Sequence, residues 1–240
     1  MSHISHNLRT VRSQIQHAAE QAGRQPRDVR LIAVSKTQPA SAIHRAFETG
    51  QRDYGENYLQ DALTKVSTLA DLQLTWHFIG RIQSNKTRSI AEHFQWVHTV
   101  DREKIARRLS DARLATQPET PLNVCLQVNI DDDASKSGLA PDAVADLAAQ
   151  CAELTGIRVR GLMTILAQSE DPDSSYQRMA ALYQSLAPQQ GWDTLSMGMS
   201  GDYAAAIHAG STMVRVGTAI FGPRIEPIAS GSDTTLERSP

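Results

Sequence analysis

The sequence of 240 residues contains few cysteines, little net charge and no long apolar segment. Its two cysteines, Cys125 and Cys151, form no C-x-x-C motif, so we expect neither a disulfide framework nor a metal site. The 24 basic and 26 acidic residues argue against a basic nucleic-acid surface. No apolar run approaches the roughly 18 residues of a membrane-spanning helix. The 40% of hydrophobic residues suffices for a folded core, so the sequence predicts a globular protein that binds neither nucleic acid nor membrane.

The N-terminus lacks the apolar core of a secretory signal peptide. Residues 1–19 carry Arg, Ser and His but no acid, a composition also found in mitochondrial transit peptides. Helical spacing of apolar residues instead favours an amphipathic helix over about residues 3–23, ended by Gly23. Two scattered cysteines fit a reducing compartment, and we therefore expect a cytoplasmic protein.

Short apolar runs, rich in β-branched residues, alternate with stretches of helical periodicity along most of the chain. This alternation predicts an α/β fold with parallel strands, either a closed (β/α)8 barrel or a doubly wound sheet. Eight evenly spaced runs favour a single (β/α)8 TIM barrel over about residues 28–224, with the N-terminal helix as an addition. Residues 225–240 are polar and read as a tail. The eight runs span 31–36, 53–57, 76–80, 96–101, 124–130, 159–165, 194–200 and 213–217.

Polar residues follow the ends of these runs, where barrel enzymes carry their chemistry. Lys36 follows the apolar run Leu31–Val34, and partial desolvation there would lower the pKa of a lysine and free its amine to attack a carbonyl. A lysine that only extends into solvent from the strand end is the alternative. Lys36 is therefore a candidate nucleophile, and the residue alone does not decide between the two interpretations.

The last two predicted strands end in a pattern typical of anion sites. Ser200 is expected to cap a helix over 202–209, and Gly217 and Thr218 follow the eighth strand. Loops at these two positions form the usual phosphate site of such barrels, although ordinary helix capping uses the same residues. Arg215 alternates with two valines and should point into the barrel, where it needs an acceptor. That acceptor is either an acid such as Glu56 or a ligand.

Several longer motifs resemble those of the YggS/PROSC family of pyridoxal 5′-phosphate (PLP) homeostasis proteins. The resemblance extends over about residues 8–224, and its motifs are long and occur in order. They are A-V-S-K-T at 33–37, Y-G-E-N-Y at 54–58, W-H-F-I-G at 76–80, Q-S-N-K at 83–86, S-K-S-G at 135–138, R-G-L-M at 160–163, S-M-G-M-S at 196–200 and A-G-S-T-M-V-R-V-G-T-A-I-F-G at 209–222.

The resemblance implies a fold-type III barrel like the N-terminal domain of alanine racemase, with PLP as cofactor. It implies that Lys36 forms a Schiff base with PLP, that Arg215 bonds the pyridine nitrogen, and that the phosphate is held by three residues of the last two loops. Asn57 and Met163 would line the ring, and Lys86 and Ser137 fall in motifs near the entrance. The phosphate residues are Ser200, Gly217 and Thr218.

The resemblance also implies buffering or delivery of PLP, with effects on amino-acid balance and with PLP-dependent apoenzymes as partners. An arginine has no acceptor, so it would donate to an unprotonated ring nitrogen and disfavour the electron-sink chemistry of PLP. A racemase of this fold also needs a second acid/base from another domain or subunit. We therefore expect a non-catalytic PLP carrier, with a fold-type III amino-acid racemase as the alternative. An open barrel mouth favours a monomer.

Overall fold

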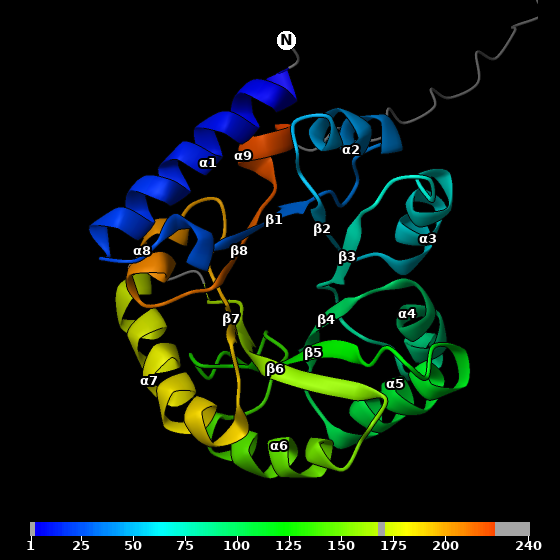
Figure 1. Cartoon of the computed structure of the whole chain (residues 1–240). Coiled ribbons are helices and arrows are strands. Elements are labelled where there is room, and N and C mark those ends of the chain that lie inside the picture. The colour runs from blue at the N-terminus through cyan, green and yellow to red at the C-terminus, as the bar shows by residue number, and fades with distance from the viewer. Residues whose placement is uncertain (1–2, 168–170, 224–240) are drawn as a thin grey trace, which may run out of the picture.

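The computed structural model describes residues 3–167 and 171–223, which form a closed barrel of eight parallel strands (Figure 1). Each strand pairs with its neighbours in sequence, and β1 pairs with β8 to close the sheet. The barrel is therefore confirmed over the doubly wound alternative. The strands are β1 (Arg30–Val34), β2 (Asp53–Glu56), β3 (Thr75–Phe78), β4 (Trp96–Val100), β5 (Leu122–Val128), β6 (Ile157–Thr164), β7 (Thr194–Ser196) and β8 (Met213–Val216).

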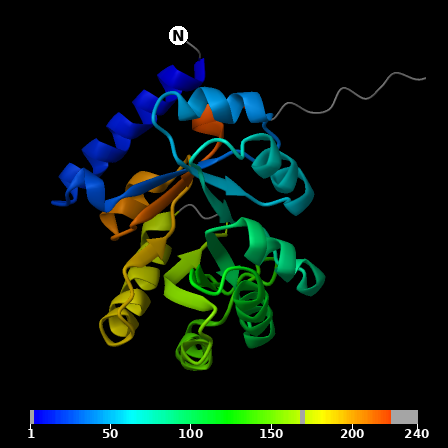
Figure 2. The ribbon, with the colours of Figure 1, turned by 45° about the vertical axis from the view of Figure 1, so that its right-hand side comes forward.

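Helices surround the barrel and cover the outer face of the strands (Figures 1 and 2). They are α1 (His3–Gln21), α2 (Ala40–Phe47), α3 (Leu59–Thr68), α4 (Thr87–His93), α5 (Glu103–Thr116), α6 (Val144–Ala152), α7 (Pro172–Gln190), α8 (Tyr203–His208) and α9 (Thr218–Phe221), with short 3₁₀ turns at Pro26–Asp28, Ser84–Lys86 and Pro141–Ala143. In the part of the chain that the structure describes, no helix is both long and apolar enough to cross a membrane.

The alternation of side chains along each strand produces two separate apolar clusters. The larger lies between the strands and the surrounding helices and includes Val214 and Val216 of β8. The smaller fills the barrel interior and contains Ile32, Trp96, Cys125, Met163 and Met213. Arg215 is the register partner of Ile32 and is 4% exposed, so it shares this interior, as the alternation of β8 predicts.

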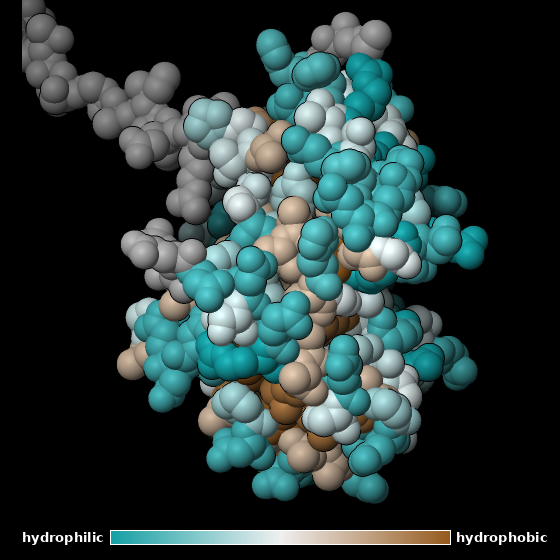
Figure 3. All heavy atoms as spheres, turned by 90° about the vertical axis from the view of Figure 1, so that its left-hand side faces the viewer, coloured by the Kyte–Doolittle hydropathy of each residue, from teal (hydrophilic) through white to brown (hydrophobic). Residues whose placement is uncertain are grey.

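Helix α1 lies beside α8 and α9, which follow the last two strands (Figure 1). Its buried face repeats at helical spacing and includes Leu8, Val11 and Ile15. The Asn7 side chain donates a hydrogen bond to the Ile220 carbonyl at 3.0 Å, which joins α1 to α9. The added N-terminal helix is thus confirmed, and it supports the elements that carry the predicted anion site. Figure 3 shows a mainly hydrophilic surface on this side of the molecule, with hydrophobic atoms in a narrow central strip.

The segment after β7 differs from the sequence prediction. The strand ends at Ser196 and not at Ser200, and α8 begins at Tyr203 with Asp202 in the N-cap position. The Asp202 carboxylate accepts a hydrogen bond from the Met199 amide at 2.6 Å and closes a tight turn. Ser200 lies within this turn, so its prediction as a helix cap is wrong. The polar tail expected at 225–240 lies outside the described residues.

Candidate functional site

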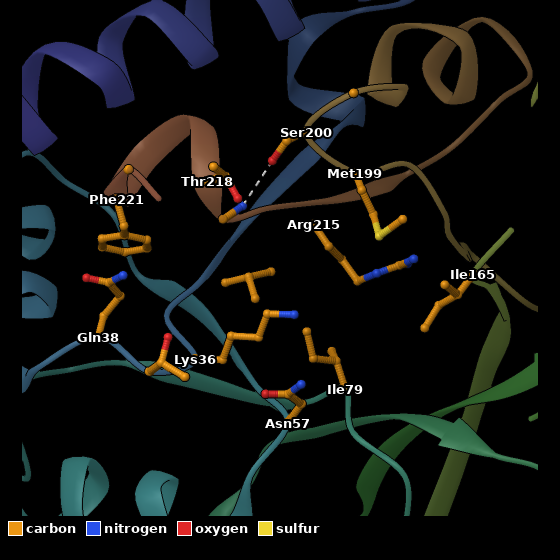
Figure 4. A pocket seen from close by; sticks show the side chains of 15 residues that line it. Lys36, Gln38, Asn57, Ile79, Ile165, Met199, Ser200, Arg215, Thr218 and Phe221 are labelled. Atoms are coloured by element: carbon orange, nitrogen blue, oxygen red, sulfur yellow. Dashed lines mark hydrogen bonds between the residues drawn. The ribbon is translucent and has the colours of Figure 1, made fainter. Parts of the chain in front are cut away.

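A cavity of about 350 Å³ opens at the carboxyl ends of the strands. Side chains from the ends of β1, β2, β3, β6, β7 and β8 surround it (Figure 4). Six of the predicted site residues line this one cavity although they are far apart in sequence: Lys36, Asn57, Ser200, Arg215, Gly217 and Thr218.

Lys36 follows a buried residue, Ser35, that is fixed by an ion pair beneath the cavity. The Ser35 hydroxyl donates to Glu56 Oε1 at 2.6 Å, and Lys65 Nζ donates to the same oxygen at 2.9 Å and to the Ser35 carbonyl at 2.8 Å. Glu56 is fully buried, and burial raises its pKa while the Lys65 charge opposes that rise. The pair holds the chain next to both Lys36 and Asn57, which follow Ser35 and Glu56 directly.

Lys65 is the functional neighbour that sequence analysis missed. It lies on the inner side of α3 and is 3% exposed, although the residue type normally faces solvent. The only sequence signal is a lysine at a position of α3 whose helical neighbour Ala62 is apolar and buried. The suggested pairing of Glu56 with Arg215 is wrong, because Glu56 pairs with Lys65.

Arg215 is held by two acceptors inside the barrel. Its guanidinium donates to Ser196 Oγ at 2.7 Å and to the Thr164 carbonyl at 2.8 Å. A guanidinium carries five N–H donors, so these two bonds leave donors for a group in the cavity that Arg215 lines. Burial lowers the pKa of Arg215, but an arginine remains protonated at neutral pH. The cavity therefore contains a fixed cationic donor.

The loops after β7 and β8 meet at one side of the cavity. Ser200 Oγ accepts a hydrogen bond from the Gly217 amide at 3.4 Å, and this contact joins the two loops (Figure 4). The first amides of a helix have no carbonyl partner within it, so the amides of Thr218 and Ala219 at the start of α9 are donors without a helical acceptor. Hydroxyl and amide groups converge here in an arrangement suited to an anion.

Asn57 has an unsatisfied polar atom at the cavity wall. Among the described residues, its buried Oδ1 has no hydrogen-bond partner, although buried polar atoms are normally paired. Gly80 allows the loop after β3 to cross directly over it, because a Cβ at Gly80 would lie 2.2 Å from the Asn57 carbonyl oxygen. The unpaired atom is the feature expected of a residue that contacts a ligand.

The remaining predicted residues do not line this cavity. Met163 is fully buried in the barrel interior, and Ile165, two residues further along the chain, lies at the cavity wall instead. Ser137 lines a neighbouring cavity of about 200 Å³ that shares Ile79 and Ile165 with the first. Lys86 lies in the turn Ser84–Lys86 and lines neither of these two cavities. Among the described residues, no group of three or more His, Cys, Asp or Glu could hold a metal ion.

Comparison with known proteins places the chain in a family. Residues 2–225 match the family described as alanine racemase, N-terminal domain. The pyridoxal phosphate homeostasis protein of Pseudomonas aeruginosa is 55% identical over 225 residues, which cover 93% of this chain and 97% of that protein. The solved structure of PipY from Synechococcus elongatus, with PLP bound, is 36% identical and superposes with a TM-score of 0.81 over 91% of this chain and all of PipY.

Alanine racemase from Corynebacterium glutamicum shares the fold at 19% identity, with a TM-score of 0.68 over 98% of this chain and 63% of the racemase chain. This likeness extends to the barrel and agrees with the closed eight-stranded sheet. The extent of the family match and the identity to the Pseudomonas aeruginosa protein lead to one conclusion: the chain belongs to the alanine racemase N-terminal domain family and, within it, to the pyridoxal phosphate homeostasis proteins.

Proposed function

We propose that this chain binds PLP at the barrel mouth and serves PLP homeostasis by holding and releasing the cofactor without turnover. The observation that carries the proposal is the convergence of Lys36, Arg215 and the loops after β7 and β8 on one cavity. PLP has an aldehyde that condenses with amines, a ring nitrogen that accepts a hydrogen bond, and a phosphate. The cavity offers a matching group for each.

The residues present fit the cofactor in their chemistry. Lys36 would supply the primary amine, and the spare donors of Arg215 would hold the ring nitrogen. The Ser200 hydroxyl and the amides of Gly217 and Thr218 would hold the phosphate. Asn57, with its unpaired buried oxygen, would contact the ring from the β2 side.

The carrier role is supported by the scarcity of proton-exchanging groups around the cavity. Among the described residues that line it, only Lys36 and Arg215 have ionisable side chains. Arg215 stays protonated, so it cannot act as a base, and Lys36 is left as the single group able to exchange a proton. Racemisation needs two acid/base groups on opposite faces of the substrate. The cavity as described therefore favours holding PLP over converting an amino acid.

Covalent binding is tested by borohydride reduction of the PLP-loaded protein followed by peptide mapping. We expect the label on Lys36 and its loss in Lys36→Ala. Lys136→Ala is a matched control, because Lys136 lines the neighbouring cavity, and it should label like the wild type. A label on Lys86 or Lys136 in the wild-type protein would refute the assignment of Lys36.

The carrier role is tested by transfer of PLP to an apoenzyme while free PLP is trapped, and by an alanine racemisation assay on the same preparation. We expect transfer and no sustained racemisation. Sustained turnover that Lys36→Ala abolishes would overturn the carrier role in favour of a racemase. We further propose that the protein acts as a monomer, and its mass in solution checks this.

A further inference from the structure

A continuous chain of buried polar groups runs through the barrel interior from Arg215 to the opposite end. Arg215 donates to Ser196 Oγ at 2.7 Å, and the same oxygen lies 2.9 Å from His98 Nδ1. His98 Nε2 lies 3.0 Å from His77 Nδ1, and His77 Nε2 lies 3.0 Å from Asp53 Oδ1. Each contact is of hydrogen-bond length, and the two imidazoles and Ser196 are fully buried.

The chemistry of the groups allows only one direction for the protons along this chain. The Asp53 carboxylate only accepts, so His77 must carry its proton on Nε2. Burial lowers the pKa of His77 and holds that of His98 well below its ordinary value, so both rings are neutral and each has one donor and one acceptor nitrogen. His77 Nδ1 therefore accepts from His98 Nε2–H, and His98 Nδ1 accepts from the Ser196 hydroxyl.

This direction leaves Ser196 Oγ with its lone pairs facing Arg215. The hydroxyl proton is committed to His98, so the oxygen can serve the guanidinium only as an acceptor. Asp53 thus determines the direction of the hydrogen bond at Ser196, because Asp53 sets the tautomer of His77 and His77 sets the tautomer of His98.

The hydrogen-bonded series of polar groups is buried along its length and reaches the surface at its Asp53 end. Its middle is covered by Trp96, whose ring stacks on His77 with centroids 5.7 Å apart. The Asp53 side chain is 20% exposed, lies 3.7 Å from Arg30 and borders a surface hollow at the barrel end opposite the cavity. A substitution at Asp53 is therefore separated from the cavity by the whole series of hydrogen-bonded groups from His77 to Arg215.

We propose that Asp53, His77, His98 and Ser196 are positioning residues that orient the Arg215 guanidinium toward the ring nitrogen of the bound cofactor. The proposal rests on the proposed function, because it assigns a role to residues that do not touch the cofactor. Ser196 and the Thr164 carbonyl hold two guanidinium nitrogens, and Arg215 has further donors for a group in the cavity that it lines. Breaking the chain at either end should loosen that orientation.

The first test needs no cofactor and no substitution. Nitrogen-15 NMR of the histidine side chains in the apoprotein, near neutral pH, reports which ring nitrogen carries the proton. We expect neutral rings with the proton on Nε2 for both His77 and His98. A proton on Nδ1 of either ring, or a charged imidazole, would overturn the directional chain. Because this measurement is independent of PLP, it decides the chain even if the proposed function fails.

The second test breaks the far end of the chain and measures PLP binding and the nitrogen-15 shift of ring-labelled PLP. Asp53→Ala removes the terminal acceptor, whereas Asp53→Asn keeps an acceptor oxygen for His77. We expect Asp53→Ala to weaken PLP binding about tenfold and to move the ring-nitrogen signal. Asp53→Asn should restore both toward wild-type values. Asp193→Ala removes an acid near the same barrel end, paired with Arg160 outside the chain, and should bind PLP like the wild type.

Ser196→Ala removes the near end and should have at least the effect of Asp53→Ala, with Ser196→Thr as the variant that keeps the hydroxyl. Folded Asp53→Ala and Ser196→Ala proteins with wild-type affinity and an unmoved ring-nitrogen signal would overturn the positioning role. Equal losses in Asp53→Ala and Asp193→Ala would also overturn it, because the effect would then be long-range charge. Wild-type protein that binds no PLP would refute the proposed function itself.

Discussion

The ion pair beneath the cavity allows a stability prediction that also tests how the site is supported. Lys65→Met removes the only cation that contacts Glu56 among the described residues, and it removes the donor to the Ser35 carbonyl. Glu56 would stay buried with one remaining donor, the Ser35 hydroxyl. Taking away one partner of a buried pair typically costs about 3–5 kcal/mol, because the other charge is left uncompensated.

We expect the free energy of unfolding of Lys65→Met to fall by about that amount, and its melting temperature by roughly 6–20 °C for a protein of this size. Urea unfolding followed by circular dichroism and by tryptophan fluorescence gives the free energy when the two transitions coincide. The double variant Glu56→Met/Lys65→Met removes both charges and should recover most of the loss. Arg88→Met is the control, because it breaks an exposed pair with Glu92 and should cost less than about 0.5 kcal/mol.

PLP loading measures the functional side of the same change. Ser35 and Glu56 directly precede Lys36 and Asn57, so loss of the pair should lower the fraction of folded protein that takes up PLP. If Lys65→Met lowered the free energy of unfolding by less than about 1 kcal/mol, the buried-pair reasoning would be refuted. So would a double variant as unstable as the single one, because the two residues would then contribute independently.

Two further predictions concern stability. Burial lowers the pKa of His77 and His98 from their ordinary value of 6.5, so below that pH the unfolded chain binds more protons at these histidines than the folded protein does. The free energy of unfolding should therefore be at its maximum above about pH 6.5. As the pH falls below that value, it should decrease by up to about 1.4 kcal/mol per pH unit for each histidine. Constant stability down to about pH 5 would contradict this. Gly161→Ala should lose about 1–3 kcal/mol, because its backbone has φ +148° and a Cβ would lie 1.8 Å from the Thr194 carbonyl oxygen. A Cβ at Gly201 would meet no atom within 4 Å, so the free energy of unfolding of Gly201→Ala should stay within about 0.5 kcal/mol of the wild type. Equal losses of stability in the two variants would contradict this prediction.

The sequence predicted the barrel because each of its eight strands carries a local signal of its own. Apolar runs separated by helical periodicity are short-range patterns, and closure follows from their number. The boundary of β7 was missed because the apolar pattern continues through Met197 and Met199, whereas the turn is set by the Asp202 carboxylate three residues away from Met199. Such a contact leaves no periodic trace in the sequence.

Five of the six predicted residues that line the cavity follow strand ends, and they were predictable because all strand ends of a parallel barrel meet at one mouth. The depth of Met163 could not be predicted, because alternation shows which side of a strand a residue faces but not how deep it lies. Met163 and Ile165 share a side of the chain, and only the register of the barrel places Ile165 nearer the mouth. The pairing of Glu56 with Lys65 depends on the packing of α3, which no motif records.

The placement of negative charge also favours a site that holds an anionic ligand. Glu56 and Asp53 have partners of their own away from the cavity: Glu56 pairs with Lys65, and Asp53 contacts His77 at the opposite end of the barrel interior. No acidic side chain is among the described residues that line the cavity, whereas the cationic side chains of Lys36 and Arg215 are. A carboxylate at this wall would repel the phosphate and supply a second proton acceptor. The arrangement of charge around the cavity therefore suits the phosphate of the proposed ligand.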